Sequence, residues 1–216
     1  MAAKSGISPN QAKQSIQGKP MKTDIILAGV GGQGILSIAT ILGQAALDEN
    51  LHIKQAEVHG MSQRGGDVQS NLRLSSEPIA SDLIALGTAD LVVSLEPMEA
   101  LRYVQYLSPE GWIVTSTVPF LNIPDYPELD AVMEALARHP RTIAFDMDEI
   151  AKQVASPRSS NMALLGAAAP FIGIETHKIE DAIRSIFARK GEAIVESNIK
   201  AFRAGLQRAR EIMEKA

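Results

Sequence analysis

A glycine-rich turn between a buried strand and a helix constrains the fold of this chain more than any other feature. Residues 24–29 read DIILAG, an apolar run typical of a buried strand, and apolar residues then recur at helical spacing from Ile35 to Leu47. The turn between them, GVGGQG, fits the pattern G-x-G-x-x-G. Strand, glycine turn and helix in this order open the βαβ unit of many α/β folds. We therefore predict an α/β domain with a tight first turn.

Strand and helix patterns alternate from this turn to about Asp146, and only helices are predicted after Phe145. Such alternation favours a parallel sheet covered by helices on both faces. The predicted fold class is α/β, a single Rossmann-like domain with a mostly parallel sheet and a helical C-terminal extension. Beyond the first strand and helix, the predicted strands are residues 52–58, 68–74, 91–95, 112–116 and 142–145, and the predicted helices are residues 97–107, 129–137, 148–154, 160–169, 179–188 and 192–215.

Composition excludes several classes of protein. The chain has no cysteine, which rules out disulfides and any zinc or iron–sulfur site held by its own thiolates. Its net charge of −4 argues against a nucleic-acid partner, and no apolar run reaches the roughly 18 residues that would span a membrane. Residues 1–20 lack the apolar core of a secretory signal. We predict a flexible leader over residues 1–20, a domain over residues 21–216 and a cytoplasmic location.

The glycine turn has two interpretations. Its three pattern glycines and the extra glycine inside the pattern could let the backbone approach a phosphate at the positive end of the following helix, or could merely make a tight strand–helix crossing. A dinucleotide site also needs an acidic residue about 20 residues further on. Glu57 lies 23 residues after Gly34, but a second unusual loop follows it instead of a helix. This departure disfavours NAD.

The second loop, residues 57–67 (EVHGMSQRGGD), concentrates polar and glycine residues. Arg64, followed by Gly65 and Gly66, could bind a phosphate or carboxylate with both of its terminal nitrogens, or could lie in a solvated surface turn. His59 could act as a base or could be a hydrogen-bonded structural residue. The four histidines of the chain are scattered, so this loop does not predict a metal site.

The two loops together, GVGGQG and QAEVHGMSQRGGDVQSNLRLS, resemble the gamma-type subunits of the 2-oxoacid:ferredoxin oxidoreductase family. Within that family the resemblance is to the beta subunits of indolepyruvate:ferredoxin oxidoreductases. Three further segments agree with it: residues 79–84 (IASDLI), 89–102 (ADLVVSLEPMEALR) and 159–167 (SSNMALLGA). The resemblance covers about residues 21–202.

The resemblance implies a subunit of an enzyme that converts an aryl 2-oxoacid, such as indolepyruvate, and coenzyme A to an aryl-acetyl-CoA, carbon dioxide and reduced ferredoxin. Thiamine diphosphate, magnesium and the iron–sulfur clusters would lie in a larger alpha subunit. The chain itself would carry no catalytic residue and would be inactive alone, with coenzyme A as the co-substrate that it contacts. The alternative function is an independent NAD(P)-dependent oxidoreductase of Rossmann type.

The resemblance also implies positions for the binding residues. The anion loop would consist of Gly29, Gly31, Gly32 and Gly34. The loop facing the active-site subunit would consist of Glu57, His59, Ser62, Gln63, Arg64, Gly65 and Gly66. Asn161 lies in the family's Asn-plus-Leu-Gly stretch, where its alternative role is a helix N-cap. The polar-faced strand 68–74 and the C-terminal helix are candidate subunit contacts, although the helix could instead pack into the core of its own chain.

Overall fold

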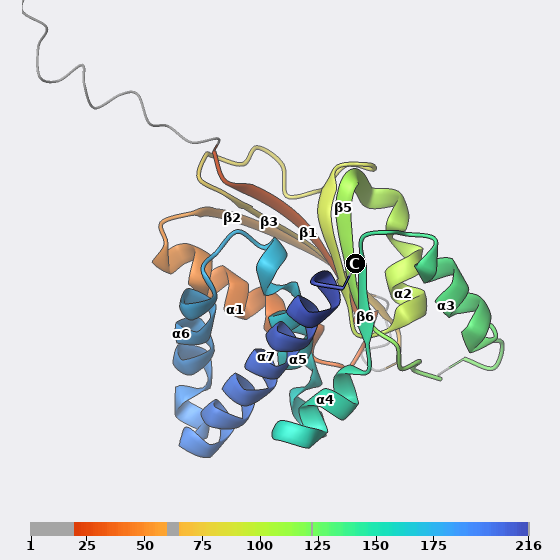
Figure 1. Ribbon diagram of the computed structural model, residues 1–216. Helices are drawn as coiled ribbons and strands as arrows, with labels where there is room; N and C mark the ends of the chain where they lie inside the picture. Colours follow the sequence, from red (N-terminus) through yellow and green to blue (C-terminus); the bar gives the residue numbers. More distant parts are fainter. Residues whose placement is uncertain (1–19, 60–64, 122, 216) are drawn as a thin grey trace, which may run out of the picture.

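The computed structural model describes residues 20–59, 65–121 and 123–215, so the predicted leader lies almost entirely outside the described residues. It contains one six-stranded sheet in the order β2-β3-β1-β4-β5-β6 (Figure 1). The strands are β1 (Lys22–Val30), β2 (His52–His59), β3 (Asp67–Ser75), β4 (Ala89–Ser94), β5 (Leu107–Ser116) and β6 (Thr142–Phe145). Strands β1, β4, β5 and β6 run parallel, whereas β3 is antiparallel to both of its neighbours, β1 and β2. The sheet is therefore mostly parallel, as predicted.

The alternation of strands and helices is interrupted between β2 and β3, where the sequence predicted two strands joined by a loop. Only residues 60–66 separate the two strands, whereas a crossover to a parallel neighbour needs about a dozen residues. The short connection forces β3 to return antiparallel to β2, with His59 facing Val68. Strand β3 thus lies inside the sheet, and Asn71 on its polar side is buried.

Two helical layers cover the sheet (Figure 1). One contains α1 (Ile35–Asp48), α4 (Met147–Val154), α5 (Ser160–Ala168), α6 (Thr176–Phe187) and α7 (Glu192–Met213), and the other contains α2 (Pro97–Arg102) and α3 (Leu129–Ala137). The helix expected over residues 97–107 ends early, because a 3₁₀ turn over Val104–Tyr106 leads directly into β5. Within the described residues, no helix is long and apolar enough to cross a membrane.

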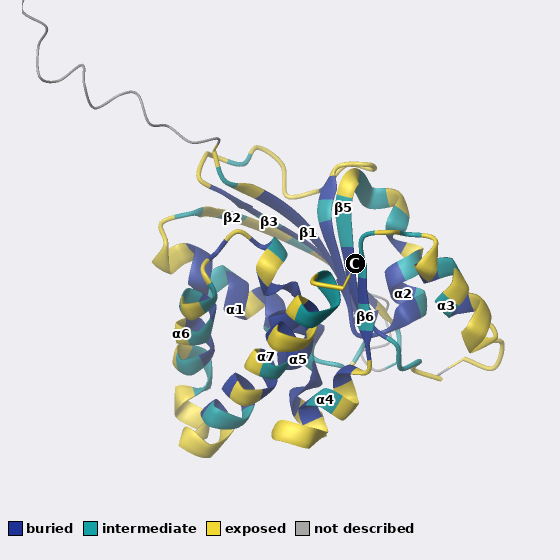
Figure 2. Ribbon diagram, in the orientation of Figure 1, coloured by how far each residue is buried: buried dark blue, intermediate teal, exposed yellow. Residues whose placement is uncertain are grey.

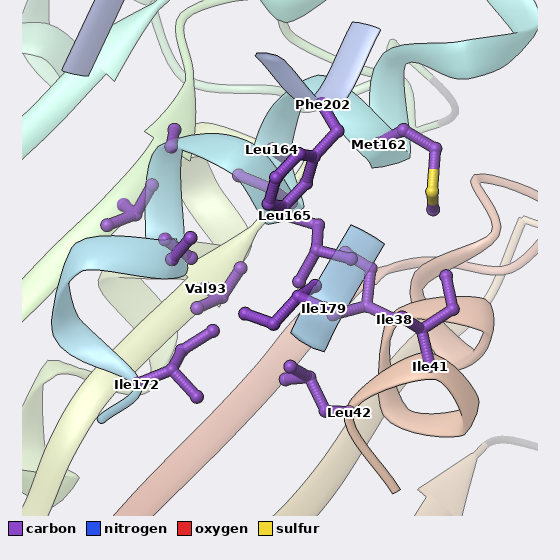
Figure 3. Close-up of a cluster of buried hydrophobic side chains, with 14 of the residues drawn as sticks. Ile38, Ile41, Leu42, Val93, Met162, Leu164, Leu165, Ile172, Ile179 and Phe202 are labelled. Carbon is purple, nitrogen blue, oxygen red and sulfur yellow. The ribbon is translucent and has the colours of Figure 1, made fainter. Parts of the chain in front are cut away.

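The largest core lies between the sheet and the five-helix layer, where Figure 2 shows mainly buried residues facing the strands. In Figure 3, Phe202 of α7 and Leu165 of α5 lie in one cluster with side chains of α1 and β4. Helices α5 and α7 can approach closely because a Cβ atom on Gly166 would overlap the carbonyl oxygen of Phe202, and one on Gly205 would overlap that of Ala163. This packing confirms the core interpretation of the C-terminal helix.

Candidate functional site

The glycine turn lies at the carboxyl edge of the parallel strands, where β1 leads into α1. Gly34 occupies the N-cap of α1 in the left-handed region, with φ of 77°, a conformation that residues with side chains adopt only with strain. A Cβ atom there would come within 2.8 Å of Nδ2 of Asn161. That amide nitrogen instead donates a hydrogen bond to the Gly34 carbonyl at 3.2 Å. Glycine at this position therefore allows the start of α1 to contact α5.

The turn is held in shape by one of its own side chains. Gln33 accepts a hydrogen bond from the Val30 N–H through Oε1 at 2.8 Å. Its Nε2 donates to the carbonyl oxygen of Leu95, just beyond β4, at 3.4 Å. The turn is thus tied to the end of the next parallel strand by the side chain of Gln33. The positive end of the α1 dipole lies beside it, which favours an anion there.

The two loops that the sequence singles out meet in space. The Gly31 N–H donates to the Gly66 carbonyl at 2.8 Å, and the Gly65 N–H donates to the Gly31 carbonyl at 3.2 Å. These paired backbone bonds fix the end of the second loop against the glycine turn. Ser62, Gln63 and Arg64 lie outside the described residues. The second loop was predicted to face the active-site subunit. The structure places two residues of that loop, Gly65 and Gly66, against the glycine turn.

A cavity of about 310 Å³ opens beside the glycine turn. Gly32 and Asn161 form one side of it, and Phe120, from the segment after β5, contributes an apolar wall. Arg158, in the 3₁₀ turn over Pro157–Ser159, and Asp148 also line the cavity, and both residues are exposed. The cavity therefore combines backbone groups, an exposed cation, an exposed carboxylate and an apolar surface. An anionic group would be favoured near the glycine turn, beside the N-terminus of α1.

A second cavity, of about 210 Å³, lies on the other side of Phe120. Glu96, only 1% exposed, accepts hydrogen bonds from the Glu99 N–H at 2.7 Å and from the Tyr126 hydroxyl at 2.5 Å. Arg102 donates to both carboxylate oxygens of Glu99, at 3.0 and 3.1 Å. Burial raises the pKa of Glu99, although Arg102 opposes the shift. Burial, and then the hydrogen bond to Glu96, also raise the pKa of Tyr126.

The structure removes one of the roles that the sequence suggested for Glu57 and one of those suggested for Asn161. Glu57 is exposed on the edge strand β2, where Gln55 donates to its carboxylate at 2.7 Å. The antiparallel strand β3 separates it from β1, so it does not stand where an acidic residue would bind the ribose of a dinucleotide. The N-cap interpretation of Asn161 is also wrong, because Ser159 is the N-cap of α5. The side chain of His59 lies outside the described residues.

Sequence reasoning missed Glu96, Tyr126 and Arg158. Glu96 could have been found, because it lies just beyond Leu95 at the carboxyl end of the buried parallel strand β4, where α/β folds place functional groups. Tyr126 and Arg158 lie in segments without periodicity, so no local pattern marks them. Among the residues that the structure describes, no group of three or more His, Asp or Glu side chains could hold a metal ion.

Comparisons with known proteins agree on one family. The family model described as pyruvate ferredoxin/flavodoxin oxidoreductase matches residues 24–208. An indolepyruvate oxidoreductase subunit of Methanothermobacter thermautotrophicus is 35% identical over 198 residues, which span 88% of this chain and 100% of that protein. The corresponding subunit of Thermococcus kodakarensis is 33% identical over 88% of this chain and 97% of its own length.

Solved structures agree on the fold. The gamma subunit of a keto/oxoacid ferredoxin oxidoreductase from Geobacter sulfurreducens has a TM-score of 0.62 and 25% identity over 88% of this chain and 99% of its own. A 2-oxoglutarate:ferredoxin oxidoreductase from Magnetococcus marinus, solved with 2-oxoglutarate, coenzyme A and succinyl-CoA, has a TM-score of 0.69 and 23% identity over 88% of this chain. The match spans only 31% of that longer chain. The sequence matches, rather than the fold alone, establish that this chain belongs to the pyruvate ferredoxin/flavodoxin oxidoreductase family.

Proposed function

We propose that this chain is a subunit of an indolepyruvate:ferredoxin oxidoreductase and that it contributes a binding edge for coenzyme A. The observation that carries the proposal is the glycine turn, which lines the 310 Å³ cavity through Gly32 and is paired on its other side with Gly65 and Gly66, which line the smaller cavity. The relatives named indolepyruvate oxidoreductase subunits support the enzyme class, since their identities extend over 88% of this chain. In such an enzyme an aryl 2-oxoacid and coenzyme A yield an aryl-acetyl-CoA and carbon dioxide, and ferredoxin receives the electrons.

The chemistry of the cavity fits part of coenzyme A. Its phosphates would lie near the glycine turn and the start of α1, where the helix dipole favours negative charge. Arg158 would add a charge-assisted hydrogen bond, and Phe120 would contact an apolar part of the ligand. A volume of about 310 Å³ holds only a portion of so long a molecule, so a partner surface would have to cover the rest. Coenzyme A bound to the Magnetococcus marinus enzyme is consistent with this assignment.

The role of this chain in the reaction is then to bind and orient, and not to break bonds. Thiamine diphosphate supplies the decarboxylation chemistry of the proposed enzyme, and iron–sulfur clusters carry its electrons. The clusters require thiolate ligands that this cysteine-free sequence does not contain, which supports placing them in a larger partner subunit. The glycine turn, Asn161 and Arg158 would hold the co-substrate while Phe120 excludes water from one side of it.

The alternative, an independent NAD(P)-dependent oxidoreductase, has no support among the relatives reported above, which are all oxoacid oxidoreductases or their subunits. The position of Glu57 on the edge strand removes the acidic residue on which that interpretation depended. Titration of the purified chain with NADH separates the two functions, since micromolar binding would restore the alternative.

The test of the proposed site is a change of Arg158 in the complex with the larger subunit. Arg158→Ala should raise the KM for coenzyme A about 10- to 150-fold, because a lost charge-assisted hydrogen bond corresponds to about 1.5–3 kcal/mol. The KM for the 2-oxoacid should not change. Arg189→Ala, which removes an exposed arginine from the turn before α7, is the matched control. Equal KM values for coenzyme A in both variants would reject the role of Arg158.

A further inference from the structure

The segment from residue 117 to 128, between β5 and α3, exposes an unusual concentration of apolar side chains. Phe120 is 40% exposed, Leu121 74% and Ile123 42%. In the described part of the chain, ten large apolar side chains are exposed, and four of them fall within residues 120–129. Single exposed apolar residues are ordinary on protein surfaces, whereas a concentration of them marks an interaction surface.

This segment is tied to the sheet at several points. The Thr117 N–H donates to the Phe145 carbonyl at 3.1 Å, and the Val118 N–H donates to the Ser116 hydroxyl at 3.2 Å. Further along, the Tyr126 hydroxyl donates to the buried carboxylate of Glu96 at 2.5 Å. Prolines at 119, 124 and 127 restrict its backbone further. These contacts hold the residues on either side of the apolar side chains against the sheet, which lowers the entropy lost on binding.

The position of the segment links it to the site. It follows β5 at the carboxyl edge of the parallel strands, next to the glycine turn. Phe120 lines both cavities, and Ile123 lines the smaller one. A surface that covered these side chains would also cover the rims of both cavities. By contrast, Leu86 is 62% exposed but precedes β4, at the opposite edge of the sheet.

The lengths of the relatives bear on which partner could cover these apolar side chains. A ketoisovalerate oxidoreductase subunit of Methanothermobacter marburgensis is 30% identical over 192 residues, which make up only 37% of its length. In that protein, as in the Magnetococcus marinus enzyme, a domain like this one is part of a much longer chain. The proposed reaction needs iron–sulfur clusters, and this sequence contains no cysteine thiolate to hold them. The remainder of the enzyme must then bind it through an exposed surface.

We propose that residues 117–121 and 123–128 form a docking surface for the larger catalytic subunit, with Phe120, Leu121 and Ile123 as its apolar contacts and the Glu96–Tyr126 hydrogen bond as its anchor. The proposal rests on the proposed function, because that function requires the larger subunit. It adds to that function the surface and the residues by which the two subunits associate over the site.

The experiment measures the affinity of this chain for the larger subunit of the same enzyme by biolayer interferometry. Leu121→Glu places a charge in the proposed contact and should weaken binding at least tenfold. Leu86→Glu makes the same change on a comparably exposed leucine at the opposite edge and should bind like the wild type. Because both leucines are largely exposed, both variants should keep the melting temperature of the wild type.

The possible results distinguish a failure of the docking surface from a failure of the proposed function. Equal affinities of wild type and Leu121→Glu would overturn the docking surface and leave the proposed function standing. A wild-type chain that does not bind the larger subunit would overturn both. Loss of self-association by Leu121→Glu, with unchanged affinity for the larger subunit, would show a contact between copies of this chain and also overturn the proposal. Tyr126→Phe should weaken binding several-fold, and an unchanged affinity would remove the anchoring role of Glu96.

Discussion

Replacement of Gly34 by alanine tests the contact between the glycine turn and α5. The left-handed backbone at this N-cap, with φ of 77°, should cost an alanine about 1–2 kcal/mol. Its Cβ atom would also lie 2.8 Å from Nδ2 of Asn161 and displace that side chain. The lost hydrogen bond to the Gly34 carbonyl should add about 0.5–1.5 kcal/mol. Gly34→Ala should therefore reduce the free energy of unfolding by about 1.5–3.5 kcal/mol in total.

A double-mutant cycle isolates the contact. In an Asn161→Ala background the side chain is already absent, so Gly34→Ala should cost only the backbone strain, and the two changes should couple by about 0.5–1.5 kcal/mol. Gly32→Ala is the matched control. Its φ of 105° is also positive, but among the described residues no atom lies within 4 Å of the added Cβ atom. It should show backbone strain without coupling to Asn161.

Urea unfolding of the purified chain measures these free energies. The single tryptophan, Trp112, reports unfolding through its fluorescence, because it stacks on Phe171 at 4.5 Å in the folded chain. A coupling energy within about 0.3 kcal/mol of zero between Gly34→Ala and Asn161→Ala would refute the contact. A coupling as large for Gly32→Ala would show that the effect is not specific to the N-cap of α1.

Two further predictions concern stability. Gly205→Ala should lower the free energy of unfolding by about 3 kcal/mol or prevent folding, because the added methyl group would overlap the Ala163 carbonyl where α5 and α7 cross; an unchanged urea midpoint would contradict this packing. Because burial raises the pKa of Glu99 above its ordinary value of 4.5, the folded state binds its proton more tightly than the unfolded state, and the contribution of Glu99 to stability should fall as pH rises above about 4.5. The stability of wild type relative to Glu99→Gln should thus decrease from pH 4 to 7, and parallel pH profiles would contradict the shift.

The parts of the fold that could be predicted from the sequence are those fixed by local patterns. Helix α3 and strand β6 match their predicted bounds, since clear periodicity ends at Ala137 and a buried run at Phe145. The direction of β3 depends on pairing with β1 across the sheet, so its alternating pattern could not reveal it. Similarly, residues 103–107 fit a helical period, but Leu107 is drawn into β5 by pairing with β4.

In the candidate site, likewise, the sequence could predict the local motif but not the contacts between distant segments. The glycine turn stood out because strand, turn and helix are neighbours in the sequence. Its contact with Gly65 and Gly66 joins segments that a helix and a strand separate, and only the fold brings them together. The hydrogen bond between Glu96 and Tyr126 likewise joins distant segments. The importance of Tyr126 follows from that buried partner and not from any motif around it.

Reconstitution of the enzyme tests the proposed function most directly. Ferredoxin reduction would be measured with indolepyruvate and coenzyme A, using this chain alone, the larger subunit alone and the two together. We predict turnover by the two together, none by this chain alone, and little by the larger subunit alone, since the co-substrate would lack one of its binding edges. Turnover by this chain alone, or equal turnover by the larger subunit with and without it, would contradict the proposed function.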